Sequence, residues 1–144
     1  MSVEMLTYSD SDDPPEASVH VVDSGLERHN YAVAPLSDVR PLASFASDAK
    51  GQVVGGAVGR TWGRCCELLQ LWVEPSYRTR GIASRLLRQF EQRAASRGCD
   101  AFYLTTLSFQ APEFYRKRGY ASIAGISGYP EGITKHLMYK ETRP

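Results

Sequence analysis

The chain has 144 residues, of which 42% are hydrophobic and 23% are charged. This length suits one domain with a buried core, and no apolar run approaches the roughly 20 residues needed to cross a bilayer. The first residues carry no secretory signal pattern. We therefore expect a single domain over residues 1–144, a cytoplasmic location and no membrane partner.

The formal net charge of +1 conceals an asymmetry between the two parts of the chain. Residues 1–50 hold nine acidic and three basic side chains, whereas residues 51–144 hold seven acidic and fourteen basic ones. The basic part suits an anionic small ligand, and charge alone would also suit nucleic acid. The three cysteines and three histidines have no metal-ligand spacing, so we expect no metal site.

The amino-terminal part predicts a short strand over residues 5–8 and a helix after Pro14-Pro15. From Arg40 onward the pattern is clearer, and Gly55-Gly56 indicates a bulge or a close backbone approach. The nearly apolar run 65–73 is typical of a strand covered on both faces. The further prediction is strands at 42–47, 52–61, 65–73, 101–107, 120–124 and 134–140, with helices at 82–97 and 112–118.

Strand 65–73, helix 82–97 and strand 101–107 form a predicted right-handed parallel βαβ unit. At its first turn, the run from Leu71 to Ala83 breaks a strand at Pro75 and begins a helix at once. The first turn of a helix presents about four unpaired amides and partial positive charge, and so binds phosphate. Gly81 would let a phosphate approach the backbone. The alternative is an ordinary loop whose arginines are solvated.

Two segments carry a family resemblance. Arg78-Thr79-Arg80-Gly81-Ile82-Ala83 is similar to the pyrophosphate signature of the GNAT superfamily of CoA-dependent N-acetyltransferases, and the segment from Phe109 to Tyr120 resembles a later motif of that family. The resemblance covers roughly Leu42 to Lys140 and is weak over residues 1–39. It implies an α/β (α+β) fold with a central mixed, mostly antiparallel sheet, a parallel βαβ crossover and flanking helices.

The resemblance also implies a site for acetyl-CoA as cosubstrate. The amides of Arg78, Thr79, Arg80, Gly81, Ile82 and Ala83 would hold the pyrophosphate, with Ser84 at the helix start. The backbone of Leu71, Trp72 and Val73 would pair with pantetheine as an added strand. Many members have glycine at the positions of Thr79 and Ala83, and asparagine at the position of Ser108. The pantetheine contact at Ser108 is therefore expected to be altered or lost.

Two residues are candidates for the chemistry. Tyr115, on the short helix, could donate to the departing CoA sulfur as general acid, with a core tyrosine as the alternative. Glu67 aligns with the general base of histone-acetylating members, and a water-relayed base or simple desolvation of the amine are its competitors. Cys99 has only Arg97 nearby to activate its thiol, so an acyl-carrier role is not expected.

These residues predict direct acetyl transfer in a ternary complex to a primary amine of a small molecule or peptide. The alternative is an inactive CoA-binding module with a regulatory or scaffold role. Nucleic-acid binding ranks last, because the arginines of the helix at 82–97 lack interleaved exposed aromatics. Homodimerisation through the last strands is a further expectation.

Overall fold

The computed structural model describes residues 4–143, which divide into two units between Ser37 and Asp38. The first unit contains one helix, α1 (Glu16–Val33), followed by the 3-10 turn η1 (Leu36–Asp38) at the boundary. The predicted helix is confirmed, and it has no buried residue. The predicted strand over residues 5–8 is wrong: these residues are extended and exposed, because no partner strand pairs with them.

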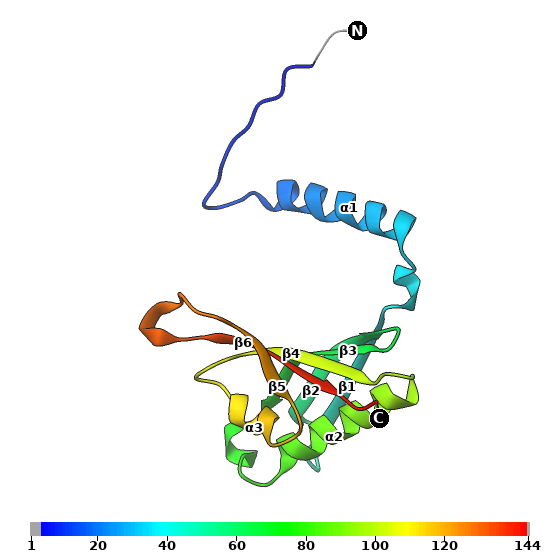
Figure 1. The fold of residues 1–144 in the computed structure, drawn as a ribbon, viewed down its shortest axis with the longest axis vertical. Helices are drawn as coiled ribbons and strands as arrows, with labels where there is room; N and C mark the ends of the chain where they lie inside the picture. Colours follow the sequence, from blue (N-terminus) through cyan, green and yellow to red (C-terminus); the bar gives the residue numbers. More distant parts are fainter. Residues whose placement is uncertain (1–3, 144) are drawn as a thin grey trace. The chain divides into compact units, whose positions relative to one another are not determined.

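The second unit is built on one six-stranded sheet (Figure 1). Its strands are β1 (Arg40–Ser47), β2 (Val53–Trp62), β3 (Cys65–Val73), β4 (Ala101–Leu107), β5 (Ala121–Ile126) and β6 (Lys135–Glu141). The order is β1-β2-β3-β4-β6-β5, and only β3 and β4 pair in parallel. The mixed, mostly antiparallel sheet with one parallel crossover is confirmed.

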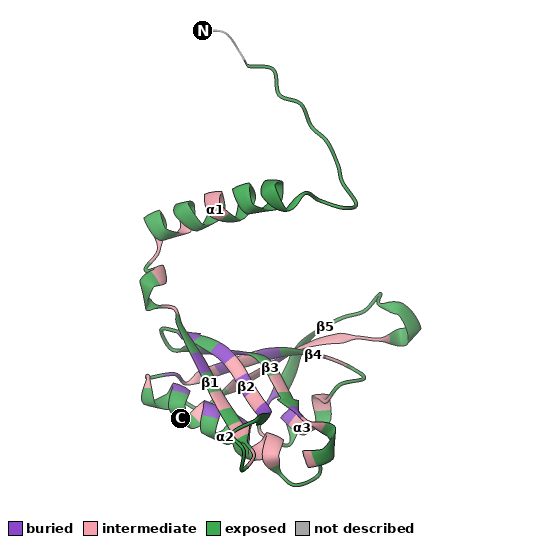
Figure 2. Ribbon diagram, turned by 180° about the vertical axis from the view of Figure 1, so that it is seen from behind, coloured by how far each residue is buried: buried purple, intermediate pink, exposed green. Residues whose placement is uncertain are grey.

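Helix α2 (Ile82–Ser96) makes that crossover and covers one face of β1, β2 and β3 (Figure 1). Its apolar stripe is buried, with Leu86, Leu87 and Phe90 only 1–2% exposed. Each such side chain stabilises the fold by roughly 1.5–3 kcal/mol. Figure 2 shows the buried residues gathered on the sheet and its helices, and α1 exposed almost throughout.

The prediction that strand 65–73 is covered on both faces is wrong for the face opposite α2. Leu69 and Trp72 are 51% and 49% exposed, so within the second unit only the α2 side is packed. Apolar character alone does not reveal this, because a strand wall that lines a cavity is as apolar as a buried one.

A bulge interrupts β3 at Leu69, since Gly59 pairs with Leu68 and Val58 pairs with Gln70. A second register shift, between the pairs Ala46–Gly55 and Ser47–Val53, adjoins the predicted Gly55-Gly56, so the irregularity expected there is confirmed. A Cβ on Gly59 would lie 2.0 Å from the Glu67 carbonyl oxygen and 2.8 Å from the Phe90 ring. This close approach of the two backbones therefore requires glycine at position 59.

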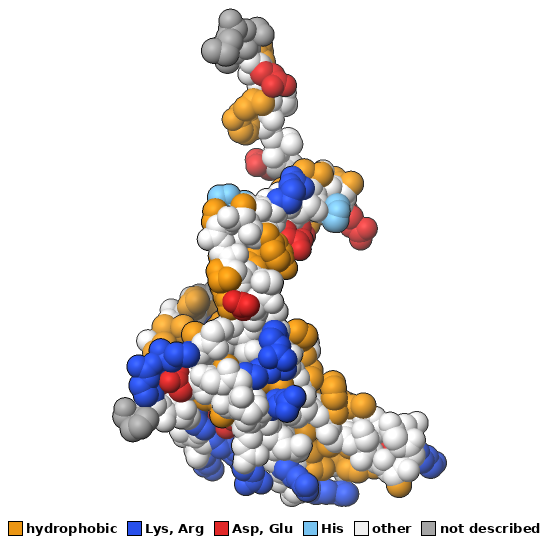
Figure 3. Space-filling model, turned by 90° about the vertical axis from the view of Figure 1, so that its right-hand side faces the viewer, with side chains coloured by type: hydrophobic (Ala, Val, Ile, Leu, Met, Phe, Trp, Pro, Cys, Tyr) orange, Lys and Arg blue, Asp and Glu red, His pale blue; other side chains and the backbone are white. Residues whose placement is uncertain are grey.

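Three other helical segments complete the unit. The short helix α3 (Pro112–Arg116) precedes β5, and the 3-10 turns η2 (Pro75–Tyr77) and η3 (Pro130–Gly132) precede α2 and β6. On the face seen in Figure 3, Lys and Arg side chains predominate over Asp and Glu in this unit, in line with the basic composition of residues 51–144. In the part of the chain that the structure describes, no helix is long and apolar enough to span a membrane.

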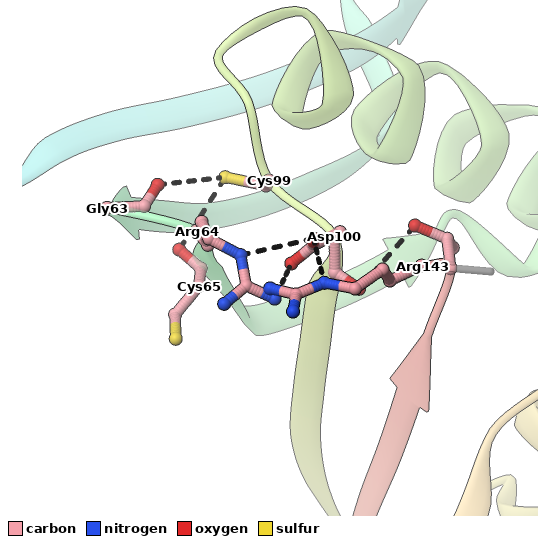
Figure 4. Close-up of polar contacts among 7 residues, drawn as sticks. Gly63, Arg64, Cys65, Cys99, Asp100 and Arg143 are labelled. Atoms are coloured by element: carbon pink, nitrogen blue, oxygen red, sulfur yellow. Dashed lines mark hydrogen bonds and ion pairs between the residues drawn. The ribbon is translucent and has the colours of Figure 1, made fainter.

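One end of the β3–β4 pair is fastened by polar contacts (Figure 4). Arg64 donates from Nε to Asp100 Oδ2 at 3.1 Å, and Arg143 Nε lies 3.2 Å from the same oxygen. The buried Cys99 thiol contacts the carbonyl oxygens of Gly63 and Cys65, each at 3.7 Å, and burial raises its pKa. This thiol is thus a packed structural group, as expected.

Candidate functional site

Strands β3 and β4 are paired only at the fastened end. The pairs are Cys65 with Ala101, Cys66 with Phe102 and Glu67 with Tyr103. The bulge at Leu69 follows at once and bends β3 away from β4. Because β2 stays paired with β3 as far as Val73, the β4-facing edge of β3 is left open over its second half.

A cavity of about 580 Å³ occupies this opening, and we call it the sheet-face cavity. Its walls come from residues of β1, β2 and β3, from β4 and from the segment leading into α3. They are Phe45, Val53, Gly55, Gly56, Val58, Leu68, Leu69, Gln70, Leu71, Trp72, Leu104, Thr105, Thr106, Gln110, Ala111 and Tyr115.

Two smaller hollows, of about 230 and 280 Å³, continue from this cavity to the start of α2, and we call them together the turn groove. The first shares Leu71, Trp72, Ala111 and Tyr115 with the sheet-face cavity. The second contains the start of α2 and shares four residues with the first, namely Val73, Arg78, Ala83 and Phe114. One path therefore leads from the open sheet face past Tyr115 to the helix start.

The backbone at the end of the turn groove has the form of an anion site. Gly81 has φ +77°, and a Cβ built on it would meet no atom within 4 Å. The amides of Ile82, Ala83 and Ser84 fall in the first turn of α2 and have no partner within the helix. Arg78 steadies the turn by donating from Nε to the Val73 carbonyl oxygen at 2.9 Å.

Thr79 adopts a left-handed conformation, with φ +63°. Such a conformation is unfavourable for a β-branched residue and is found where the surrounding structure imposes it. Its hydroxyl bonds the Arg78 carbonyl oxygen at 2.6 Å. The chain therefore places threonine at a backbone position of the type that glycine favours.

The arginines around the turn divide into two kinds. Arg80 does not line the groove: it lies over the Tyr77 ring, 5.2 Å from the centroid, and donates to the Ser76 carbonyl oxygen. Arg118 does line it, and donates from Nε to Ser84 Oγ at 3.2 Å. Its guanidinium also lies 3.7 Å from the Phe114 ring centroid.

Tyr115 stands where the cavity and the turn groove meet. It is 8% exposed, and its ring packs edge-on against Phe114 and Tyr120, with centroids 5.2 and 5.8 Å away. Burial raises the pKa of Tyr115 to about 12. The hydroxyl therefore keeps its proton at neutral pH and is a hydrogen-bond donor.

Besides Arg80, two predicted site residues lie away from this path. Glu67 does not line the sheet-face cavity, and its carboxylate lies 2.9 Å from an Arg60 guanidinium nitrogen at the fastened end of the strands. Ser108 lines neither hollow of the turn groove, since its hydroxyl accepts from the Thr134 amide at 3.0 Å and ties β4 to β6.

Phe114 was not expected in the site. The basic run 116–118 predicts a solvated face, with contact of one of its side chains to the CoA 3′-phosphate as the alternative, and the structure places Arg118 half-buried against Phe114 and Ser84. The i, i+4 spacing of Phe114 and Arg118 is the signal that predicts their contact. The remaining predicted residues, Leu71, Trp72, Val73, Arg78, Thr79, Gly81, Ile82, Ala83, Ser84 and Tyr115, are brought together along the path.

A splayed parallel pair whose opening leads to an amide-rich helix start offers room for an extended ligand and donors for a phosphate group. The family model described as acetyltransferase (GNAT) family matches residues 5–120. The chain belongs to this family, and is therefore an acyltransferase of the kind that uses acetyl-CoA as cosubstrate.

Individual relatives agree with this assignment. The chain is 40% identical to a blasticidin-S acetyltransferase of Streptomyces morookaense over 74% of this chain and 82% of that one. An acetyltransferase of Agrobacterium fabrum is 31% identical over 74% and 78%. A crystal structure of a Bacillus cereus acetyltransferase superposes with a TM-score of 0.76 at 25% identity, over 92% of this chain and 97% of that one.

Proposed function

We propose that this protein transfers an acetyl group from acetyl-CoA directly to a primary amine of a small molecule. The observation that carries the proposal is the continuity of the sheet-face cavity with the turn groove at Tyr115. Two substrates can enter from opposite ends of this path and meet at one side chain. Direct attack in a ternary complex needs such an arrangement.

The turn groove fits the cosubstrate. The unpaired amides of Ile82, Ala83 and Ser84 and the open space over Gly81 suit a pyrophosphate. The open edge of β3 suits an extended amide-bearing arm, which would pair with its backbone as an added strand. Bound acetyl-CoA would supply a thioester-activated acetyl group at this place.

Tyr115 is our candidate for the group that stabilises the leaving sulfur. Complete proton transfer from a phenol of pKa about 12 to a thiolate whose acid has a pKa of about 8.5 is uphill by roughly 5 kcal/mol. We therefore propose that Tyr115 donates a hydrogen bond throughout the step and does not hand over its proton first.

The amine must be neutral when it attacks. A lysine-like amine with a pKa of about 10.4 is neutral in only about one molecule in 2,500 at pH 7. Glu67 remains the predicted base, but its ion pair with Arg60 and its place outside the cavity favour a water relay or amine desolvation. Glu67→Gln separates these routes: a direct base gives a 100-fold loss of kcat, and the other routes give less than threefold.

A small-molecule acceptor is favoured over a peptide by two observations. The relative at 40% identity is a blasticidin-S acetyltransferase. The sheet-face cavity, at about 580 Å³, is the size of a small-molecule pocket, with Gln70 and Thr105 as polar groups among apolar walls. The first acceptor to test is therefore blasticidin S, beside simple amines and a lysine peptide.

Calorimetric titration with acetyl-CoA tests the cosubstrate site. Gly81→Trp should abolish binding, because its side chain enters the turn groove. Gly98→Trp is the matched control: Gly98 has φ +91°, a Cβ there would also meet nothing within 4 Å, and it ends the same helix at the far side. Equal loss in both variants would contradict the site.

Transfer itself is measured as release of free CoA thiol in the presence of each amine. Binding of acetyl-CoA with transfer to at least one amine supports the enzyme. Binding without transfer to any member of the panel favours the alternative, an inactive CoA-binding module with a regulatory or scaffold role.

A further inference from the structure

The side chain of Gln110 is held in place by the turn that follows β4. Its backbone amide donates to the carbonyl oxygen of Leu107, the last residue of β4, at 2.8 Å. The Leu107 amide donates in return to Gln110 Oε1, also at 2.8 Å, and the buried Thr106 hydroxyl donates to the same oxygen at 3.4 Å. Gln110 is exposed, but its side chain is therefore fixed.

These contacts also determine which atom of the Gln110 amide is free. A backbone N–H can only donate, so the atom that faces the Leu107 amide must be the oxygen. Because Oε1 is engaged by two donors, Gln110 can offer a ligand its Nε2 group, which carries two N–H donors. Within residues 4–143, no residue accepts a hydrogen bond from Nε2.

Gln110 lies on the acceptor side of the path. It lines the sheet-face cavity but neither hollow of the turn groove. The next residue, Ala111, lines both the cavity and the first hollow, as Tyr115 does. The free N–H donors of Gln110 therefore border the place of the proposed transfer, on the side away from the pyrophosphate site.

The rest of the cavity wall limits what Gln110 can bind. Among the described residues that line the sheet-face cavity, none carries a charged side chain. A carboxylate on a ligand would lose hydration there without gaining a cation, which is unfavourable. A neutral carbonyl oxygen needs only a hydrogen-bond donor, and Nε2 supplies one.

We propose that Gln110 selects the acceptor by donating from Nε2 to a neutral carbonyl oxygen. The acceptor is then an amine that also carries an amide or a similar uncharged carbonyl group. This inference rests on the proposed function and names its substrate class. The hydrogen bond would hold the body of the acceptor in the sheet-face cavity, with its amine directed toward Tyr115.

Two amines of nearly the same shape test this selection. β-Alaninamide and isopentylamine both carry an amine joined through two methylene groups to a branched end, which is a carboxamide in the first and an isopropyl group in the second. The two amines differ in pKa. The readout is therefore the change in the ratio of their kcat/KM values between wild type and variant, in which this difference cancels.

Gln110→Glu removes the donor and keeps the contact with the turn, because a carboxylate oxygen can accept from the Leu107 amide in the same way. The ratio of kcat/KM for β-alaninamide to that for isopentylamine should fall about tenfold. Gln110→Met removes the donor without adding a charge and should lower the ratio by a similar factor. The Kd of acetyl-CoA should stay within twofold in both variants.

Gln92→Glu is the matched control for the added charge. Gln92 is exposed on α2 and lines neither the sheet-face cavity nor the turn groove. The ratio should be the same in this variant as in the wild type.

Nuclear magnetic resonance of the Gln110 side-chain amide measures the contact without turnover. In isotope-labelled protein, its signals are identified by their loss in Gln110→Met. β-Alaninamide should shift these signals at concentrations about tenfold below those that isopentylamine requires. β-Alanine, which has a carboxylate in place of the carboxamide, should also require about tenfold more.

The outcomes separate the two proposals. An unchanged ratio in both Gln110 variants would overturn the selection and leave the acetyltransferase proposal intact. An equal loss with both amines would also overturn it, because Gln110 would then serve the transfer and not the choice of acceptor. If neither amine is acetylated, the resonance titration decides: a preference for β-alaninamide supports the selection, and its absence overturns it. Failure of the proposed function is seen independently, as absence of acetyl-CoA binding or of transfer to every amine in the panel.

Discussion

The two halves of the β3–β4 pair use the same strands for opposite purposes. In the first half, three residue pairs join the strands, and the side chains are engaged by Arg60, Arg64 and Arg143. In the second half the strands separate, the edge of β3 is open, and cavities replace side-chain contacts. The bulge at Leu69 divides the fastened half from the open half.

The difference shows how a sheet can be stable and still present a free backbone edge. An unpaired edge is ordinarily a liability, because its amides and carbonyls invite other strands. Here the fastened half holds the two strands together, so β3 keeps its place while its open half borders the sheet-face cavity and the turn groove. Substitutions in the first half should thus change stability, and those in the second should change catalysis.

The largest effect on stability is expected at Gly59 of β2, where the β3 backbone near Glu67 comes too close for any side chain. Gly59→Ala should lower the free energy of unfolding by at least about 3 kcal/mol, because the new Cβ would lie 2.0 Å from a carbonyl oxygen that cannot move aside. Urea unfolding followed by circular dichroism measures it.

Gly56→Ala is the control for Gly59. It lies on the same strand, but its Cβ would lie 3.0 Å from the movable ring of Phe45 and 3.4 Å, an ordinary contact distance, from the Ser44 carbonyl oxygen. We expect a loss of about 1 kcal/mol or less. Similar losses of stability in Gly59→Ala and Gly56→Ala would contradict the distinction between a fastened half and an open half.

In the open half, Tyr115→Phe should reduce kcat about 100-fold and leave the acetyl-CoA Kd within twofold. The pKa of about 12 also predicts a pH profile: the Tyr115 hydroxyl stays protonated, so its ionisation should not lower the rate below about pH 11. The raised pKa also predicts how stability depends on pH. Below pH 10 the hydroxyl is protonated in both the folded and the unfolded chain, so the free energy of unfolding does not depend on it. As pH rises from 10 toward 12, only the unfolded chain loses this proton, and the fold is destabilised.

Tyr120→Phe is the control for this variant. Its hydroxyl donates to Glu91 Oε2 at 3.0 Å, away from the path. We expect a loss of about 1–2 kcal/mol in stability and little change in kcat. A loss of kcat in Tyr120→Phe equal to that in Tyr115→Phe would mean that ring packing, and not the Tyr115 hydroxyl, determines the rate.

Asp100→Ala should show the reverse of Tyr115→Phe, with lower stability and unchanged kcat/KM. The Arg64 and Arg143 side chains that it pairs with are 53% and 51% exposed, so each ion pair contributes less than about 1 kcal/mol. We expect a total loss of about 1–2 kcal/mol, which 1 M salt should reduce. A fall in kcat/KM would show that the halves are coupled.

The sequence predicts the strands and helices of this unit well, because the hydrophobic periodicity and the glycine and proline positions indicate the same boundaries. Strand 65–73 matches β3 at both ends, and the helix expected over 82–97 is α2, Ile82–Ser96. Gly81 and Gly98 bound it at positive φ, where glycine is the favoured residue. Once β3 and α2 are placed, the turn residues of the site between them are placed as well.

The divergence of the strands could not be predicted in the same way. Glu67 and Val73 share a strand, but whether a residue faces the cavity depends on where β3 leaves β4, and this depends on the bulge. Glu67 lies before it and Trp72 lies after it. Phe45 was missed for a related reason, because its place in the cavity depends on the register of β1 against β2.

The smallest expected effect is at Thr79, where the open half includes a strained backbone position. Thr79→Gly should raise the free energy of unfolding by about 0.5–1 kcal/mol, because glycine tolerates φ +63° and the relief exceeds its greater entropy cost in the unfolded chain. Ser76→Gly, in the 3-10 turn η2 where φ is negative, should instead lose about 0.5–1 kcal/mol. If acetyl-CoA binding weakens in Thr79→Gly although stability rises, the threonine holds the turn ready for its ligand. Unchanged binding would assign the strain to the fold of the turn alone.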